Sequence, residues 1–317
     1  MEKFNGFTKG VNLGGWFSQC DYSKERLDNF ITGEDIKKIA SWGMDHVRIP
    51  IDYNILQNSN GTPKAEGYAY IDNALEMCGR EGLNTVLDLH KTEGYSFDRG
   101  ENESGFFDNA VYQERFMSLW QEMAKRYGNN DSIAFELLNE ITDKSFSEKW
   151  NAISKECIKR IRTIADNTVI LVGGYWNNSV ASVKDLEKPF DDKVVYNCHC
   201  YDPLQFTHQC APWVEQERAD CSKKMSYAEC GFTAEKFIGH FAEAAEHAKK
   251  NGTVLYCGEY GVIDRVAPEE VLLWFKDINA AFNHYGIGRS AWNYKEMDFG
   301  LSDDRMKDVT NELIKYL

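Results

Sequence analysis

Short apolar runs recur along the chain, and each ends in polar residues or glycine. They are rich in β-branched and aromatic residues and are too short for buried helices, which favours strands. We predict eight strands, at residues 8–13, 45–50, 83–89, 132–138, 168–173, 193–198, 253–258 and 286–291.

Between these runs the apolar residues fall three or four positions apart, as on one face of a helix. The predicted helices cover Gly33 to Trp42, Tyr68 to Gly82, Val111 to Tyr127, Ser147 to Ile164, Thr233 to Lys250 and Glu269 to His284. Alternating strands and helices imply parallel pairing, because each parallel crossover needs a long connection. Eight repeats in 317 residues predict an α/β fold of the (β/α)8 TIM barrel type, with residues 1–317 as a single domain. A doubly wound open sheet is the structural alternative, but no G-x-G-x-x-G motif follows the first predicted strand.

The longest irregular stretch is residues 202–231, after the sixth predicted strand. It contains Trp213 and three cysteines, Cys210, Cys221 and Cys230, and we interpret it as a loop or insertion within the domain. Long loops of this kind are often lids or binding walls, although a decorative insertion fits the sequence equally well.

The charge balance narrows the possible partners. With 36 Lys and Arg against 50 Asp and Glu, the formal net charge is −14, which disfavours nucleic acid, anionic membranes and polyanionic substrates. The same charge could also serve only to keep the protein soluble. We therefore expect a neutral substrate, no nucleic-acid or membrane partner, and a monomer.

Cysteine content and the first residues bear on location. The nine Cys include no C-x-x-C pair and do not suggest a disulfide framework, which favours a reducing compartment or an anaerobic setting. The N-terminus MEKFNGFTKG lacks the apolar stretch of a signal peptide. We expect a cytoplasmic protein, or a secreted one if a signal peptide was removed before Met1.

Polar and aromatic residues stand at the ends of six of the eight predicted strands. In a (β/α)8 barrel these carboxyl ends meet at one mouth, where active sites lie. The residues are Arg48, His90, Asn139, Glu140, His199, Tyr201, Glu259 and Trp292. Two of them are acids from different parts of the barrel, so we expect Glu140 and Glu259 to face one common space.

Two carboxyls that flank one space suit the cleavage of a glycosidic bond. One protonates the leaving oxygen, while the other attacks the anomeric carbon or activates water. The acid needs a raised pKa, and the second group must stay ionised. Arg48 and Tyr201 could hold Glu259 as the anion, whereas Glu140 follows the neutral amide of Asn139. This asymmetry assigns the acid role to Glu140.

The motifs at these positions resemble those of glycoside hydrolase family 5. They are VNLGGW near the N-terminus, VRIP at Arg48, LDLH at His90, FELLNE at Glu140, HCY at His199, YCGEYG at Glu259 and AWNYK at Trp292. The combination that is specific to this family is Asn-Glu at the end of the fourth strand with Glu at the end of the seventh. The resemblance implies a retaining mechanism, with Glu140 as general acid/base and Glu259 as the nucleophile that forms a covalent glycosyl-enzyme.

The resemblance also implies supporting roles. Arg48 and Tyr201 position Glu259, and His199 lies near Glu140. Asn139 and His90 bind hydroxyls of the sugar under attack, and Trp292 stacks on that sugar. Three further aromatic residues are candidate sugar platforms, because a flat apolar ring matches the C–H face of glucose: Trp16, Trp176 and Trp213.

The resemblance identifies the substrate less precisely than it identifies the reaction. The form with NLGGW, FELLNE and WNYK is similar to bacterial endo-β-1,4-glucanases, including some that cleave mixed-linkage β-1,3-1,4-glucans. We expect an endo-β-glucanase of this kind, acting on β-glucan polysaccharide or oligosaccharide. Ile141 and Lys91 depart from residues common in the family, and a β-mannanase or an exo-β-1,3-glucanase is the alternative. A non-catalytic glucan-binding barrel is disfavoured because both acids are intact.

No cofactor and no metal are expected. The chain has no second phosphate-binding glycine loop. A group of potential zinc ligands surrounds the sixth strand: Cys198, His199, Cys200, His208 and Cys210. In a strand, however, Cys198 and Cys200 face opposite to His199, so these three cannot converge on one ion.

Overall fold

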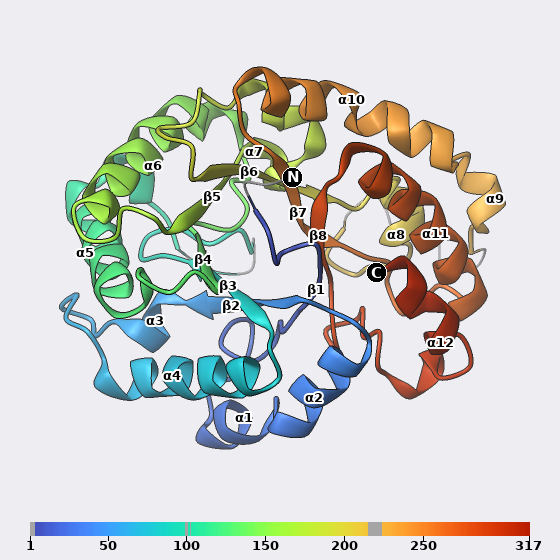
Figure 1. Cartoon of the computed structure of the whole chain (residues 1–317), viewed down its shortest axis with the longest axis horizontal. Helices are drawn as coiled ribbons and strands as arrows, with labels where there is room; N and C mark the ends of the chain where they lie inside the picture. The colour runs from blue at the N-terminus through green and yellow to red at the C-terminus, as the bar shows by residue number, and fades with distance from the viewer. Residues whose placement is uncertain (1–3, 99–100, 102, 215–223) are drawn as a thin grey trace.

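The centre of the protein is a closed barrel of parallel strands in the order β1 to β8 (Figure 1). The structure is a computed structural model that describes residues 4–98, 101, 103–214 and 224–317. The strands are β1 (Lys9–Asn12), β2 (His46–Asp52), β3 (Asn84–Lys91), β4 (Ile133–Glu136), β5 (Val169–Gly173), β6 (Val194–Cys200), β7 (Leu255–Tyr260) and β8 (Gly288–Ala291). Each predicted run overlaps one of these strands, so the (β/α)8 prediction is confirmed.

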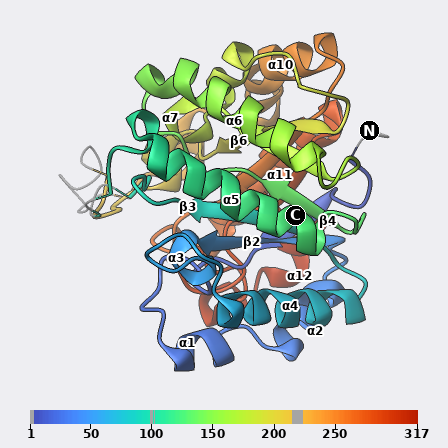
Figure 2. The same cartoon turned by 90° about the vertical axis from the view of Figure 1, so that its left-hand side faces the viewer.

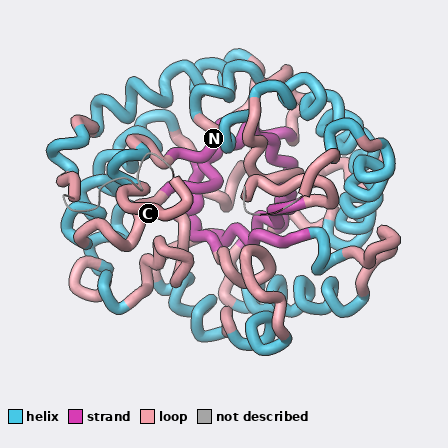
Figure 3. Tube along the Cα trace, turned by 180° about the vertical axis from the view of Figure 1, so that it is seen from behind, coloured by secondary structure: helices cyan, strands magenta, loops and turns pink. Residues whose placement is uncertain are grey.

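Helices surround the strands on the outside of the barrel, as the cyan ring around the magenta strands in Figure 3 shows. The long helices are α2 (Gly33–Ser41), α4 (Ala65–Arg80), α5 (Ala110–Tyr127), α6 (Ser147–Arg162), α10 (Ala234–Lys250) and α11 (Pro268–Tyr285). They correspond to the six predicted helices. In the side view of Figure 2, α4 and α10 lie on opposite sides of the strands.

Shorter helical segments occupy the connections. The α-helical ones are α1 (Lys24–Asn29), α3 (Tyr53–Leu56), α7 (Tyr175–Asn178), α8 (Leu204–Thr207), α9 (Tyr227–Cys230) and α12 (Thr310–Leu313). The 3-10 segments are η1 (Phe106–Asp108), η2 (Lys144–Phe146), η3 (Val180–Asp185), η5 (Asp304–Met306) and η6 (Ile314–Tyr316). None of the helices in the described residues is long and apolar enough to cross a lipid bilayer.

Local sequence signals explain where the helices begin and end. Helix α2 starts with a capping box, in which Thr32 and Asp35 bond to each other's backbone N–H groups. Helix α11 starts at Pro268 and ends before Gly286, whose φ of +66° suits glycine. Its buried residues recur at helical spacing and face the barrel: Val271, Trp274, Phe275, Ile278 and Phe282.

The inside of the barrel is layered. Its lower layer is apolar and consists of Phe4, Phe7, Val86, Ala134, Leu171, Val195 and Tyr256. Because inward positions recur every second residue, the next layer toward the mouth on β3, β4 and β6 contains Asp88, Glu136 and Asn197, all buried. From this middle layer upward, polar side chains lead into the mouth, while in the lower layer the buried ring of His46 lies 2.7 Å from the hydroxyl of Tyr256.

Residues 202–231 carry the short helices α8 and α9, and part of this stretch, including Cys221, lies outside the described residues. The side-chain amide of Gln209 bonds both the N–H and the carbonyl of Met225, which ties the two described parts together. Cys210 is disulfide-bonded, whereas Cys230 is a free thiol. The cysteine pattern as a whole does not suggest a disulfide framework, but Cys210 takes part in a disulfide.

Candidate active site

Glu140 stands at the mouth, four residues after the end of β4. The segment that carries it still runs beside the barrel, because the N–H of Asn139 donates to the carbonyl of Leu89 in β3 at 3.0 Å. The buried indole of Trp120 donates to the carbonyl of Leu137 at 3.0 Å. These two bonds explain why Asn139 and Glu140 act as an extension of the strand.

The carboxyl of Glu140 is enclosed by two polar side chains. Its side chain is 12% exposed, and Nδ1 of His199 lies 2.8 Å from Oε1. The amide Nδ2 of Asn177 donates to Oε2 at 2.6 Å. Burial raises the pKa of Glu140 to about 7, while the hydrogen bond from Asn177 acts in the opposite direction. Burial also lowers the pKa of His199 to about 4, so this imidazole is neutral at neutral pH.

Glu259 faces the same space because β7 contains a bulge. Tyr256 points inward, so strict alternation would turn residue 259 outward. The pairing with β6 shifts between the pairs Cys198 to Cys257 and His199 to Glu259, which leaves Gly258 as the extra residue. The bulge thereby aims Glu259 into the barrel.

The carboxylate of Glu259 is held by a cation and a hydroxyl. Nη1 of Arg48 donates to Oε1 at 2.7 Å, and the hydroxyl of Tyr201 donates to Oε2 at 2.9 Å. One carboxylate oxygen each from Glu140 and Glu259 and a ring nitrogen of His199 all lie within 4.8 Å of one another. The structure thus brings the two acids together around one space.

Arg48 is the electrostatic centre of the layer below the mouth. Its guanidinium forms a bidentate pair with Glu136 at 2.7 and 2.8 Å and lies 3.0 Å from Asp88. Burial opposes a charged guanidinium, but the carboxylates of Asp88, Glu136 and Glu259 keep the pKa of Arg48 above its usual value. Glu136 is therefore a structural acid below the mouth, and it holds Arg48 in place.

His90 and Trp292 form one wall of the space. Their rings are parallel, with centroids 5.9 Å apart, and Nδ1 of His90 lies 2.6 Å from Oδ2 of Asp88. Burial lowers the pKa of His90 to about 3 and raises that of Asp88 to about 7. Asn139 accepts from Arg48 through Oδ1, while its Nδ2 is buried without a hydrogen-bond partner in the described part of the chain. That free donor is available to a ligand.

The candidate sugar platforms differ sharply in exposure. Trp176 is 54% exposed at the end of β5, and Trp213 is exposed in the insertion. Trp16 is only 2% exposed, stacks on Phe17 and donates its indole N–H to the carbonyl of Leu27. The prediction of a sugar platform at Trp16 is therefore wrong, because the chain after β1 turns this ring into the core.

The described part of the insertion reaches the site through edge-to-face contacts between aromatic rings. Tyr201 contacts His208 edge to face with centroids 4.9 Å apart, and His208 contacts Trp213 at 6.3 Å. The hydroxyl of Tyr201 is also the donor to Glu259. These contacts place His208 and Trp213 next to the residue that bonds Glu259, and a role of the insertion as a binding wall stays a prediction.

Asn177 is the site residue that the sequence did not predict. It lies in α7, where Trp176, Asn177 and Asn178 all have positive φ, at 51°, 57° and 54°. This left-handed turn follows β5 directly, and the N–H of Asn177 bonds the carbonyl of Ile141 at 2.9 Å. The only sequence signal is the Asn-Asn pair of GGYWNN, since Asn tolerates left-handed backbone better than most residues.

Two groups of potential metal ligands occur among the described residues. The first is Glu140, His199 and Glu259, which is the acid pair itself. The second is Cys200, Asp202 and His240, in which Nε2 of His240 lies 3.1 Å from the carboxylate of Asp202. Neither group is the one considered from sequence around Cys198, His199 and Cys200.

The chain is similar to proteins of known family. The family model described as Cellulase (glycosyl hydrolase family 5) matches residues 5–298. Cellodextrinase A of Ruminococcus flavefaciens is 55% identical over 290 residues, which cover 91% of this chain and 86% of that protein. Endoglucanase C of Acetivibrio thermocellus is 38% identical over 338 residues, covering 98% of each chain. The structure of endoglucanase Cel5A from Thermotoga maritima superposes with a TM-score of 0.84 at 24% identity, covering 100% of this chain and 98% of that one, and shows the same fold.

Proposed function

The chain belongs to the cellulase family, glycosyl hydrolase family 5, and we propose that it hydrolyses β-1,4-glucosidic bonds with retention of configuration. The observation that carries the proposal is the spacing of the two acids, whose nearest oxygens lie within 4.8 Å. Retaining glycosidases hold their carboxyls about 5–5.5 Å apart, whereas inverting ones need about 6.5–9.5 Å to admit a water. The spacing favours direct attack by a carboxylate.

In the first step, Glu140 protonates the glycosidic oxygen while Glu259 attacks the anomeric carbon. The pKa of Glu140, raised by burial to about 7, keeps a proton on this group near neutral pH. Arg48 and Tyr201 hydrogen-bond to the carboxylate of Glu259 and stabilise its ionised form. The leaving sugar departs with the proton, and a covalent glycosyl-enzyme forms on Glu259.

In the second step, the carboxylate of Glu140 removes a proton from water, and the oxygen of that water displaces Glu259 from the anomeric carbon. His199 contacts Glu140 as a neutral imidazole and so leaves the carboxyl free to lose and regain its proton. In each step, therefore, one proton is transferred by the carboxyl group of Glu140.

The walls of the mouth suit a glucosyl unit in the attacked position. Trp292 offers a ring that is fixed by its parallel contact with His90. Nδ2 of Asn139 has no hydrogen-bond partner among the residues that the structure describes, which points to a hydrogen bond with a sugar hydroxyl. Beyond Glu140, the exposed ring of Trp176 suits stacking against the leaving part of the chain.

The substrate we propose is a β-1,4-glucan chain, cut at internal bonds and including short cello-oligosaccharides. The name of cellodextrinase A, at 55% identity, supports the short substrates, and that of endoglucanase C supports internal cleavage. Mixed-linkage β-1,3-1,4-glucan remains a proposed substrate because of the motif resemblance given by NLGGW, FELLNE and WNYK.

The test is the product profile on cello-oligosaccharides, mixed-linkage β-glucan, carboxymethyl-cellulose and mannan, with Glu259→Gln as the blank. We expect the wild type to shorten the glucans to mixed oligosaccharides and the blank to release nothing. Proton NMR of the first products should show the β-anomer. Release of the α-anomer would refute retention, and cleavage of mannan alone would refute the proposed substrate.

A further inference from the structure

A group of three potential metal ligands lies between the end of β6 and helix α10: Cys200, Asp202 and His240. Cys200 is the last residue of β6, Asp202 follows two residues later, and His240 is part of α10. The thiol sulfur, one carboxylate oxygen and one ring nitrogen of these residues all lie within 4.8 Å of one another. Two elements that are distant in sequence therefore place sulfur, oxygen and nitrogen donors around one point.

The strand directs Cys200 away from the active site. His199 faces the mouth, where its ring lies 2.8 Å from Glu140, so the next residue points to the outer side of the barrel. Cys200 accordingly belongs to the apolar core between the barrel and the helices. Alternation excludes a site that joins Cys198, His199 and Cys200, but it places no limit on ligands from the loop after β6 and from α10. The group is thus separate from the acid pair.

The spacing of the donor atoms suits a tetrahedral zinc ion. Sγ of Cys200 lies 3.8 Å from Oδ2 of Asp202, and Nε2 of His240 lies 3.1 Å from the carboxylate oxygen of the same residue. Bonds of about 2.3 Å to sulfur and about 2.0–2.2 Å to nitrogen and oxygen, at tetrahedral angles, separate the ligand atoms by about 3.4–3.6 Å. The observed distances differ from this range by a few tenths of an ångström, which small side-chain rotations can absorb.

The group is anchored on its inner side and open on its outer side. Cys200 is fully buried, whereas the side chains of Asp202 and His240 are 45% and 28% exposed. The carbonyl of Asp202 accepts the indole N–H of Trp274 at 2.9 Å, which fixes the backbone of this residue against α11. The atom Nε2 of His240 is buried and has no hydrogen-bond partner among the described residues. The group therefore offers a fixed sulfur, an unused ring nitrogen and a side from which an ion can enter.

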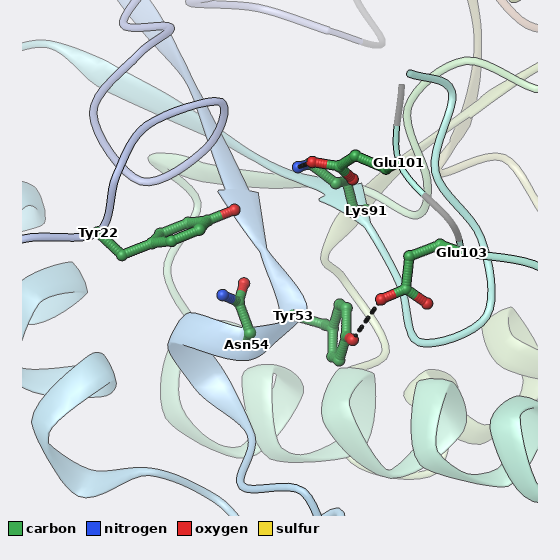
Figure 4. Close-up of a pocket in the computed structure, with 6 residues that line it drawn as sticks. All are labelled: Tyr22, Tyr53, Asn54, Lys91, Glu101 and Glu103. Carbon is green, nitrogen blue, oxygen red and sulfur yellow. Dashed lines mark hydrogen bonds and ion pairs between the residues drawn. The ribbon is translucent and has the colours of Figure 1, made fainter. Parts of the chain in front are cut away.

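The pocket shown in Figure 4, of about 310 Å³, illustrates how polar groups look when they are already satisfied. There the ammonium of Lys91 forms an ion pair with Glu101, and the hydroxyl of Tyr53 donates to Glu103 at 2.8 Å. The positive charge of Lys91 would repel a metal ion. Asp202, by contrast, forms no ion pair with Lys or Arg in the part of the chain that the structure describes. Its charge is therefore available to a cation.

We propose that Cys200, Asp202 and His240 form a zinc site that joins the end of β6 to α10. Tyr201 lies between two of these ligands in sequence, and its hydroxyl donates to Glu259 on the opposite side of the strand. The ion fixes the segment that carries this hydroxyl, but it lies outside the mouth and does not contact the substrate. The site is therefore structural, and it does not depend on the proposed function.

The mixture of donors selects zinc among common metal ions. Thiolate and imidazole ligands suit zinc, whereas magnesium and calcium prefer oxygen ligands alone. Binding breaks the S–H bond of Cys200 and releases its proton to solvent. The resulting thiolate and the carboxylate of Asp202 together balance the two positive charges of the ion. The described residues supply three ligands, so a water molecule completes the tetrahedron.

The test uses the full chain after removal of metal with a chelator. Competition with a chromophoric chelator should show that one zinc ion binds per chain. Cobalt in place of zinc should produce the near-ultraviolet absorption of a bond between cobalt and a thiolate. Zinc should also raise the melting temperature, because it binds the folded protein in preference to the unfolded chain.

Single substitutions test each ligand. His240→Ala and Asp202→Asn change partly exposed residues, and each should weaken zinc binding by more than the roughly 10- to 100-fold that loss of an outer-shell partner costs. Cys200→Ser should abolish the absorption of the cobalt–thiolate bond. The matched controls are Cys20→Ser, at a partly exposed thiol, and His284→Ala, at an exposed histidine, and both should bind zinc as the wild type does.

Two results would overturn the proposal directly: no stoichiometric binding of zinc to the wild type, or binding that is unchanged in both His240→Ala and Asp202→Asn. Zinc that blocks hydrolysis at one equivalent and still binds to His240→Ala would place the ion at Glu140, His199 and Glu259 and would overturn it as well. The binding and absorption measurements need no sugar, so they remain decisive even if the proposed function fails.

Discussion

Replacing Asn177 by glycine should shift the upper limb of the pH profile to higher pH. The amide of Asn177 donates to the carboxyl of Glu140 at 2.6 Å and so stabilises its ionised form. Without this donor the pKa of Glu140, about 7 in the native protein, rises further. The protonated acid then persists to higher pH, and kcat/KM falls later as the pH increases. Glycine is the suitable replacement because the φ of Asn177 is +57°.

The size of the shift follows from the exposure of the bond. A hydrogen bond to a charged group contributes about 1.5–3 kcal/mol when buried. Asn177 is exposed, and discounting for solvent leaves about 0.7 kcal/mol. At 1.36 kcal/mol per pKa unit this corresponds to about half a pH unit. Asn177→Asp should shift the limb further in the same direction, because a second carboxylate would oppose ionisation of Glu140.

The assay is kcat/KM on a cello-oligosaccharide between about pH 4 and pH 9, where the upper limb reports the acid in the free enzyme. Asn167→Ala, at an exposed position before the start of β5, serves as the control with an unchanged limb. A limb that moves to lower pH in Asn177→Gly, or that does not move in either Asn177 variant, would refute the assignment of Glu140 as the acid whose pKa Asn177 lowers.

Other substitutions separate chemistry from packing. Glu140→Ala should retain attack on substrates with very good leaving groups, which need no protonation, whereas Glu259→Ala should lose both kinds of substrate; equal losses in rapid kinetics would contradict the two roles. Trp176→Ala should raise KM on cello-oligosaccharides with little change in melting temperature, because its ring is exposed. Trp16→Ala should instead destabilise the fold by about 3–5 kcal/mol in denaturant titration, since this ring is buried; a KM effect without loss of stability would restore its role as a platform.

The barrel and the position of its mouth were predictable because they depend on period and topology. The ends of parallel strands share one edge, so Arg48, Glu140 and Glu259 could be placed together without knowing any local geometry. The structure adds that Glu259 reaches the mouth only through the bulge at Gly258. The CGEYG sequence contains the glycine but does not show which residue becomes the extra one.

The features that escaped prediction depend on single turns. Asn177 reaches Glu140 because three successive residues adopt positive φ, and no period in the sequence reveals such a turn. Trp16 is buried because the chain after β1 folds back against Leu27, a contact set by tertiary packing. Cys210 is disulfide-bonded although the cysteine pattern as a whole does not suggest it.

The apolar layer of Phe4, Phe7 and Tyr256 closes the bottom of the barrel beneath the polar groups. Among the described residues, substrate, water and products therefore share one entrance. On the proposed mechanism, the first sugar must leave the side of Glu140 before water can take its place. When oligosaccharide is abundant, another sugar hydroxyl competes with water for that place, and chain transfer accompanies hydrolysis. The closed bottom of the barrel therefore makes the ratio of transfer products to hydrolysis products depend on the oligosaccharide concentration.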